Sequence, residues 1–197
     1  MLMPSQASIR QHIRKRRASL STQQQLEAAR KVTQHIQQLG LFYKHQHAAC
    51  YLANQGEVRT ELLIEKLWQH QNNCYLPALH WSKKNTLHFL PFNEETALIH
   101  NHYGILEPAF QPKHIRHPYA LDIIFMPLVA FDTNGHRIGM GGGYYDRTLN
   151  FLRYRHIWRA PKLVGLAYEF QKVDSISQQS WDIPLDLIIT EQNIYKT

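Results

Sequence analysis

A glycine-rich segment, RIGMGGGYYDR, runs from Arg137 to Arg147 and constrains the fold more than any other part of the sequence. Four of the chain's nine glycines lie within five positions of it, at 139, 141, 142 and 143. Glycine lets backbone N–H groups turn toward a ligand, because no Cβ stands in the way. A loop of this kind, entered from an apolar strand and followed by a helix, is typical of phosphate-binding sites.

The segments on either side fit a strand and a helix. Residues 121–131, LDIIFMPLVAF, are almost entirely apolar, as a buried central strand is, and 144–152 predict a short helix. Neither common nucleotide fingerprint is present: no Gly-Lys-Ser/Thr ends the loop, and Tyr144 occupies the third glycine position of a dinucleotide motif. A plain tight turn remains an alternative. A phosphate-binding loop is favoured, because ordering four glycines costs backbone entropy.

Composition limits the class of protein. The 197 residues suit one domain, residues 1–197, and the 44% hydrophobic and 19% charged content is that of a globular chain. The longest apolar run is too short to span a bilayer and no secretory signal begins the chain, so we expect a cytoplasmic protein. Cys50 and Cys74 lie in apolar segments and are expected to be buried thiols. The net charge of +7 indicates an anionic partner.

Along the chain, helices alternate with short apolar strands. Apolar periodicity predicts helices over 8–19, 22–39 and 60–70, and Ser21 with Gln24 forms a capping box before the second. Short strands are expected over 48–53, 74–79, 87–90, 163–167 and 187–190, while 94–116 is expected to be rich in loops. This alternation predicts a single-domain α/β fold, Rossmann-like, with a mostly parallel sheet covered by helices on both faces. The glycine loop then falls at the carboxyl ends of the strands, where ligands bind.

Three acidic residues stand out, and each also has a structural explanation. Asp146 directly follows the glycine loop, where it can hold Mg²⁺ or can cap the helix or pair with Arg147 or Arg153. Asp182, in WDIP, is by itself a turn former. Glu57 ends the segment YLANQGE, at a strand end that can carry a site, although loop acids are more often solvated.

The first predicted helix is strongly basic. Arg10, Arg14 and Arg17 follow i, i+4, i+7 spacing and share one face. From charge alone this face is solvated or binds an anion such as RNA, and without interleaved aromatic residues it is weak evidence for nucleic acid.

Taken together, these features resemble the 5-formyltetrahydrofolate cyclo-ligase family over nearly the whole chain. The likeness is strongest in IIFMPLVAFDTNGHRIGMGGGYYDRTL, from Ile123 to Leu149, where strand, Asp-x-x-Gly turn and glycine loop follow the family pattern in order. The N-terminal arginine helix, YLANQGEVRT and WDIPLD agree in type and order. The resemblance implies conversion of 5-formyltetrahydrofolate and ATP, with Mg²⁺, into 5,10-methenyltetrahydrofolate, ADP and phosphate.

The resemblance also implies a role for individual residues. Asp146 and Asp182 match the magnesium ligands, and Arg137 and Tyr144 are the expected catalytic residues. The positions that match ATP contacts are Gln6, Arg10, Arg137, Ile138, Gly139, Met140, Gly141, Gly142, Gly143, Tyr144 and Tyr145. The positions that match folate contacts are Leu52, Glu57, Met140, Gly141, Gly142, Gly143 and Tyr144.

Two departures from the family pattern concern charge at the phosphates. Gln6 stands where members often have Lys, and Met140 and Gly142 stand where many have Arg or Lys. Arg10, Arg137 and Arg147 are therefore expected to supply more of the positive charge.

Two other functions compete with the cyclo-ligase. Another phosphate-handling α/β enzyme, similar to a sugar-phosphate isomerase or a kinase, would explain the glycine loop but not the YYD ending together with Asp182. A basic RNA-binding module would explain the charge but not the loop. The expected partners are ATP and 5-formyltetrahydrofolate, with surplus positive charge that suits a polyglutamate tail, and we expect a monomer that binds neither nucleic acid nor membrane.

Overall fold

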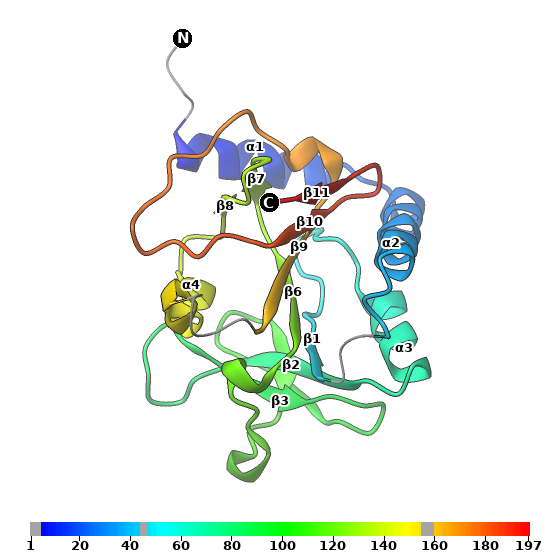
Figure 1. Ribbon diagram of the computed structural model, residues 1–197, viewed down its shortest axis with the longest axis vertical. Helices are drawn as coiled ribbons and strands as arrows, with labels where there is room; N and C mark the ends of the chain where they lie inside the picture. Colours follow the sequence, from blue (N-terminus) through cyan, green and yellow to red (C-terminus); the bar gives the residue numbers. More distant parts are fainter. Residues whose placement is uncertain (1–4, 44–46, 155–159) are drawn as a thin grey trace.

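A seven-stranded sheet forms the centre of the molecule (Figure 1). The computed structural model describes residues 5–43, 47–154 and 160–197. The strands lie in the order β11-β10-β9-β6-β1-β2-β3. Their bounds are β1 (His47–Ala49), β2 (Asn73–Leu79), β3 (Leu87–Pro91), β6 (Ile123–Pro127), β9 (Lys162–Leu166), β10 (Leu187–Ile189) and β11 (Ile194–Lys196).

Five neighbouring strands of this sheet are parallel. β10, β9, β6, β1 and β2 pair in parallel, and the antiparallel strands β11 and β3 close the two edges. Numbered among themselves along the chain, the parallel strands follow the order 2-1-3-4-5, which is that of flavodoxin-like doubly wound folds. The predicted α/β class with a mostly parallel sheet is confirmed.

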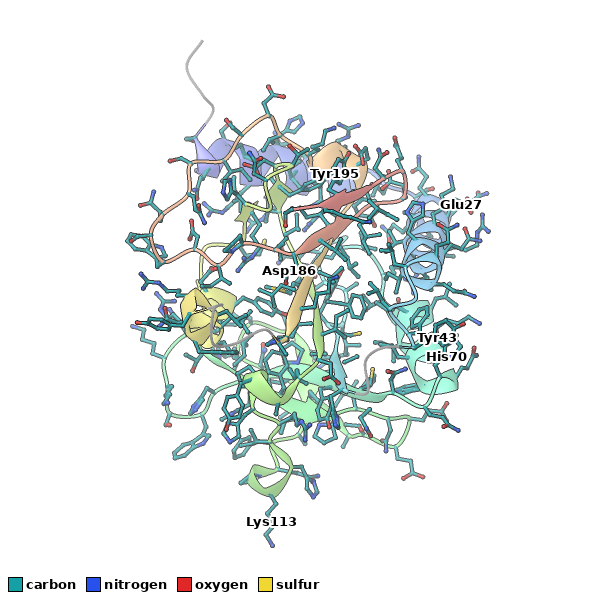
Figure 2. The ribbon with its side chains drawn as sticks, viewed as in Figure 1. Glu27, Tyr43, His70, Lys113, Asp186 and Tyr195 are labelled. Carbon is teal, nitrogen blue, oxygen red and sulfur yellow. The ribbon has the colours of Figure 1, made fainter. Side chains whose placement is uncertain are left out.

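Helices cover both faces of the sheet, as predicted. Side chains alternate along β6: Ile123 and Phe125 join a core with the helices α2 (Thr22–Gln38) and α3 (Glu61–Gln69). Ile124 and Met126 point to the other face and join a second core. That core includes residues from α4 (Tyr144–Thr148) with the 3₁₀ turn η3 (Asn150–Tyr154) that follows it, and from residues 183–185. On the first face, Tyr43 packs edge-on against His70 with ring centroids 4.7 Å apart, where the ends of α2 and α3 meet (Figure 2).

The N-terminal helix α1 (Gln6–Ala18) lies beyond the carboxyl end of β6, near the small hairpin of β7 (Ala130–Phe131) and β8 (Arg137–Ile138) (Figure 1). Ile13 is its buried anchor and packs with Val129, Ala130 and Ile138. This contact fixes α1 beside the start of the glycine loop.

The predicted strand over 121–131 is in fact two strands. β6 ends at Pro127, and β7 leaves the main sheet to pair with β8. The side chain of Gln171 donates to the carbonyls of Leu128 and Val129, both at 2.8 Å, so these two groups are satisfied outside the sheet. Hydrogen bonds from Gln171, a residue distant in the sequence, therefore take the place of strand pairing where β6 ends.

Other element bounds also differ from the expectation. The strand expected over 48–53 ends at Ala49, and the helix expected over 144–152 changes to 3₁₀ geometry after Thr148. The 94–116 region, expected to be loops, contains a hairpin. The elements that the sequence did not predict are β4 (Leu98–His100), β5 (Leu106–Pro108), β7, β8, β11 and the 3₁₀ turns η1 (Pro112–His114), η2 (Pro118–Ala120) and η4 (Glu169–Gln171).

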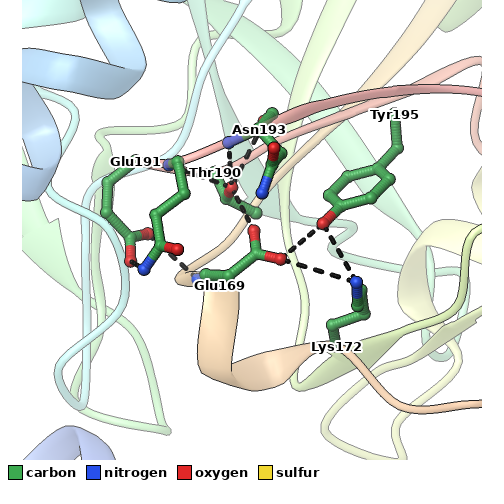
Figure 3. Close-up of polar contacts among 7 residues, drawn as sticks. Glu169, Lys172, Thr190, Glu191, Asn193 and Tyr195 are labelled. Atoms are coloured by element: carbon green, nitrogen blue, oxygen red, sulfur yellow. Dashed lines mark hydrogen bonds and ion pairs between the residues drawn. The ribbon is translucent and has the colours of Figure 1, made fainter.

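A cluster of polar side chains fastens η4 to the β10–β11 hairpin (Figure 3). The carboxylate of Glu169 accepts hydrogen bonds from the hydroxyls of Thr190, at 2.6 Å, and Tyr195, and lies 3.7 Å from the ammonium of Lys172. The cluster fixes the turn that directly follows Tyr168, a buried residue at the carboxyl end of β9.

Two further expectations concern burial and membranes. Cys50 and Cys74 are buried free thiols, as predicted. Within the described residues, no helix has both the length and the apolar character needed to cross a bilayer.

The predicted capping box at the start of α2 is present. The Ser21 hydroxyl accepts from the Gln24 N–H at 3.2 Å, and the Gln24 side chain accepts from the Ser21 N–H at 2.8 Å. Ser21→Ala should lower the free energy of unfolding by about 1 kcal/mol, because the Gln24 N–H loses its side-chain acceptor. Urea denaturation of the variant measures this change, and a loss below about 0.3 kcal/mol would mean that water replaces the cap without cost.

Candidate functional site

The site lies at the carboxyl edge of the parallel strands. In doubly wound sheets a ligand crevice forms where the strand order reverses, which here is between β1 and β6. Residues 50–57 leave β1 at this edge, and residues 128–143 leave β6 at the same edge and contain the glycine loop. The parallel pairing of β1 with β6 therefore directs both segments to one side of the sheet.

The glycine loop has the backbone geometry that its composition predicts. Gly141 and Gly143 have φ of +103° and +65°, and Gly143 is the N-cap of α4. A Cβ on Gly143 would lie 2.7 Å from Nη1 of Arg147. The same guanidinium donates a hydrogen bond to the Gly142 carbonyl at 2.6 Å and so stabilises the conformation of the loop. The positive φ thus disfavours a side chain at Gly143, and any Cβ there would also displace the Arg147 guanidinium.

Arg10 reaches the same loop from α1. Its Nε donates to the carbonyl of Gly139 at 2.8 Å, and its Nη2 donates to Oε1 of Gln6 at 3.0 Å. Gly139 is exposed, and Met140 is 43% exposed, so this part of the loop is open to a ligand. Ile138, in contrast, is buried against Ile13 and can meet a ligand only through its backbone.

Two tyrosines leave the loop in different directions. The hydroxyl of Tyr144 shares a 2.9 Å hydrogen bond with that of Tyr103, and the two rings meet edge-on. Burial raises the pKa of Tyr144 to about 12, and its hydrogen bond with Tyr103 acts in the same direction. Tyr145 turns inward and packs against the second core, where burial and the nearby Glu57 raise its pKa. Tyr144 is therefore the ring that can face a ligand.

The structure brings Asp146 and the Asp182 segment together. The Arg137 guanidinium, 7% exposed, donates to Oδ1 of Asp146 at 2.6 Å and also to the Ile183 carbonyl. The Ile183 N–H donates to the same carboxylate oxygen at 3.3 Å, which places Asp146 beside the peptide that follows Asp182. Asp182 also closes a turn, because its Oδ2 accepts from the Gln179 N–H at 2.8 Å.

These contacts decide between the alternatives for Asp146. Its partner is Arg137 rather than Arg147 or Arg153, and Gly143 rather than Asp146 caps the helix. The Asp146 side chain is 26% exposed, so part of it is accessible. Within the residues that the structure describes, no three His, Cys, Asp or Glu side chains form a metal cluster. Two carboxylates nevertheless fit Mg²⁺, which is commonly held by one or two carboxylates together with phosphate oxygens.

Glu57 lies at the other side of the crevice. Its Oε2 accepts from the Asn54 N–H at 3.1 Å, and its backbone carbonyl accepts from the Tyr168 hydroxyl at 3.3 Å. Burial raises the pKa of Glu57, while the positive charge of Arg17 and the Asn54 hydrogen bond oppose this rise. Leu52, two residues beyond the buried Cys50, is partly buried against the first core.

The three arginines of α1 do not share one environment. Arg14 is exposed, Arg10 is partly buried at the glycine loop, and Arg17 is only 2% exposed. Arg17 donates to the Leu128 carbonyl, just beyond β6. Burial lowers the pKa of the Arg17 guanidinium, and the charge of Glu57 opposes this change.

Sequence reasoning missed three residues that line this region: Arg17, Tyr103 and Tyr168. Arg17 stands in a run of four basic residues, RKRR, and the charge pattern does not show which one points inward. Tyr103 lies in the region expected to be loops, and Tyr168 directly follows a predicted strand. The position of Tyr168 at a strand end was the one available signal, because such positions commonly carry ligand contacts.

Comparison with known proteins gives one consistent result. The sequence profile of the 5-formyltetrahydrofolate cyclo-ligase family matches residues 2–191. The chain is 41% identical over 184 residues to the 5-formyltetrahydrofolate cyclo-ligase of Haemophilus influenzae, covering 92% of this chain and 95% of the relative. It is 35% identical over 184 residues to the enzyme of the same name from Escherichia coli K12, covering 93% and 99%.

Solved structures agree with the sequence comparison. The NMR structure of Aquifex aeolicus 5,10-methenyltetrahydrofolate synthetase superimposes with a TM-score of 0.80 at 29% identity, covering 97% of this chain and 92% of that one. The 5,10-methenyltetrahydrofolate synthetase of Mycoplasma pneumoniae gives a TM-score of 0.71 at 26% identity, covering 95% and 99%.

Proposed function

The chain belongs to the 5-formyltetrahydrofolate cyclo-ligase family, and from this membership we propose that it cyclises 5-formyltetrahydrofolate to 5,10-methenyltetrahydrofolate, using ATP and Mg²⁺ and releasing ADP and phosphate. One observation carries the proposal beyond family membership. The glycine loop and the Glu57 segment open at the same edge of the sheet, and α1 contacts both. Two substrates can therefore meet there.

The ATP phosphates are assigned to the glycine loop. Backbone N–H groups of residues 139–143 can approach phosphate oxygens, because glycine leaves the backbone accessible. The Arg10 guanidinium contacts the loop at Gly139 and can exchange this carbonyl for a phosphate oxygen. Gln6 stands where family members often have Lys. Its side-chain oxygen accepts a hydrogen bond from the Arg10 guanidinium and so helps to hold Arg10 in position. Arg137 adds positive charge next to the first loop residue.

Asp146 and Asp182 are the proposed holders of Mg²⁺. When bound there with the nucleotide, the ion supplies charge neutralisation for the transferred phosphoryl group. Arg137 fixes the Asp146 carboxylate through their 2.6 Å contact. The Ile183 N–H donates to the same oxygen and limits its rotation.

The folate is assigned to the edge of the sheet that carries both Glu57 and Tyr144. A carboxylate can accept hydrogen bonds from the donor-rich edge of the pterin, and an aromatic ring can cover its apolar face. Leu52 supplies apolar surface at the same strand end. The exposed Met140 and the glycines beside it are assigned to both substrates, so the formyl group and the γ-phosphate can meet at the loop.

The reaction then needs alignment and charge neutralisation more than covalent help from the protein. The formyl oxygen attacks the γ-phosphorus, forming an O–P bond as the bond to ADP breaks. The N10 lone pair next attacks the formyl carbon, the C–O bond breaks, and phosphate leaves with the formyl oxygen while N10 loses its proton. Arg10, Arg137 and the loop N–H groups stabilise the charge on the phosphoryl oxygens.

The purified protein should form the methenyl chromophore from 5-formyltetrahydrofolate only when MgATP is present. The absorbance change of the product measures this directly, and omission of ATP or chelation of Mg²⁺ provides the controls. A protein that hydrolyses or transfers phosphate on other substrates but leaves 5-formyltetrahydrofolate unchanged would favour the other phosphate-handling enzymes. Absence of any nucleotide binding would exclude both.

Gly143→Val should weaken ATP binding by about tenfold or more, because a β-branched residue strains a left-handed backbone and meets Arg147. Gly40→Val is the matched control, since Gly40 has nearly the same φ, +67°, but no atom within 4 Å of its Cβ position. Calorimetry with ATP on both folded variants measures the difference. Equal ATP affinity of the two variants would mean that the loop does not bind the phosphates.

A further inference from the structure

The two inward arginines of α1 reach two different parts of the crevice. Arg10 donates to Gly139 in the glycine loop, and Arg17 donates to Leu128 at the end of β6. They are seven residues apart, so they lie on one face of the helix and roughly 10 Å apart along its axis, given a rise of ~1.5 Å per residue. One rigid element thus extends from the proposed phosphate site toward the Glu57 segment.

The Glu57 segment rests directly on Arg17. At Gly56, φ is +71°, and a Cβ there would lie 3.0 Å from Cβ and 3.2 Å from the carbonyl oxygen of Arg17. The backbone of the segment therefore approaches α1 as closely as a glycine allows. Arg17 is therefore packed directly against the residue that precedes Glu57.

The Arg17 guanidinium is buried without a full set of partners. Its Nη2 donates to Leu128, while its Nε has no hydrogen-bond partner. A buried charge is costly unless an opposite charge compensates it. Among the described residues, Glu57 is the carboxylate whose charge acts most strongly on Arg17, ahead of Tyr51, Tyr168 and the like-charged Arg14. The charge of Arg17 therefore depends on Glu57 for compensation.

We propose that Arg17 is the positioning residue of the folate subsite, where its buried side chain, packed against Gly56, holds the Glu57 carboxylate in place without touching the substrate. The inference rests on the proposed role of Glu57 in folate binding and adds the group that makes this role possible. Arg10 belongs to the proposed phosphate subsite and Arg17 to the proposed folate subsite, so α1 connects the two subsites.

The surroundings of Glu57 give the proposal a pH signature. The titratable groups that face Glu57 are Arg17 from α1, Tyr51 beyond β1, Tyr145 from α4 and Tyr168 beyond β9. Burial raises the pKa of all three tyrosines, so they stay neutral near pH 7 and Arg17 is the one positive group among the four. Loss of Arg17 should raise the pKa of Glu57 further, so that folate binding weakens at low pH and recovers as the pH rises.

Steady-state kinetics of four single variants and one double variant test this inference. Arg17→Met should raise the KM for 5-formyltetrahydrofolate about tenfold at pH 7 and leave the KM for ATP within about twofold. Arg17→Lys keeps the charge and should stay within about threefold of the parent. Arg14→Met removes an exposed charge from the same helix and should change neither constant. Glu57→Gln should raise the folate KM, and adding Arg17→Met to it should change that value by less than about twofold.

Several results would overturn the inference. If the effects of Arg17→Met and Glu57→Gln multiply in the double variant, Arg17 acts independently of Glu57, and the role of Glu57 stands without it. If Glu57→Gln leaves the folate KM unchanged while methenyl product still forms, the assignment of Glu57 fails together with the inference, but the cyclo-ligase function does not. If Arg17→Met does not fold, Arg17→Lys provides the test. If the folate KM of Arg17→Lys is as high as that of Glu57→Gln, the positive charge at position 17 does not have the proposed role.

Discussion

The parallel pairing of β1 with β6 decides where every other functional element of the chain lies. Parallel neighbours end at the same edge, so the Glu57 segment after β1 and the glycine loop after β6 both emerge there. The core beneath is formed by alternating residues of the same strands, with Ile123 and Phe125 facing one layer of helices and Ile124 and Met126 the other. The residues that stabilise the sheet therefore also fix the geometry of the site.

Compensated charge is the second feature of this edge. Arg137 pairs with Asp146, and Arg17 lies in the electric field of Glu57, so these two inward-pointing basic residues have acidic counterparts. The basic helix that by itself suggested an RNA-binding face turns Arg17 inward and Arg10 onto the glycine loop. What the helix supplies to this edge of the sheet is thus a pair of directed guanidinium groups, while Arg14, Lys15 and Arg16 are exposed.

Local patterns predicted much of this arrangement. The capping box at Ser21, the positive φ values in the glycine loop and the alternation of helices and strands depend on neighbouring residues, and all three are present. The end of β6 was not predictable, because it depends on Gln171, more than forty residues away, which donates hydrogen bonds to the carbonyls of Leu128 and Val129. Arg17 was missed for the same reason: its inward direction depends on where α1 packs, and four adjacent basic residues look alike in the sequence.

Direct reaction between two substrates at one edge of the sheet can be tested with an isotope. 5-Formyltetrahydrofolate carrying heavy oxygen in its formyl group is turned over with unlabelled ATP in unlabelled water, and the released phosphate is analysed by mass spectrometry. Under the proposed attack of the formyl oxygen on the γ-phosphorus, each phosphate released should carry one heavy oxygen. Unlabelled phosphate formed together with methenyl product would contradict direct transfer and would separate ATP hydrolysis from ring closure.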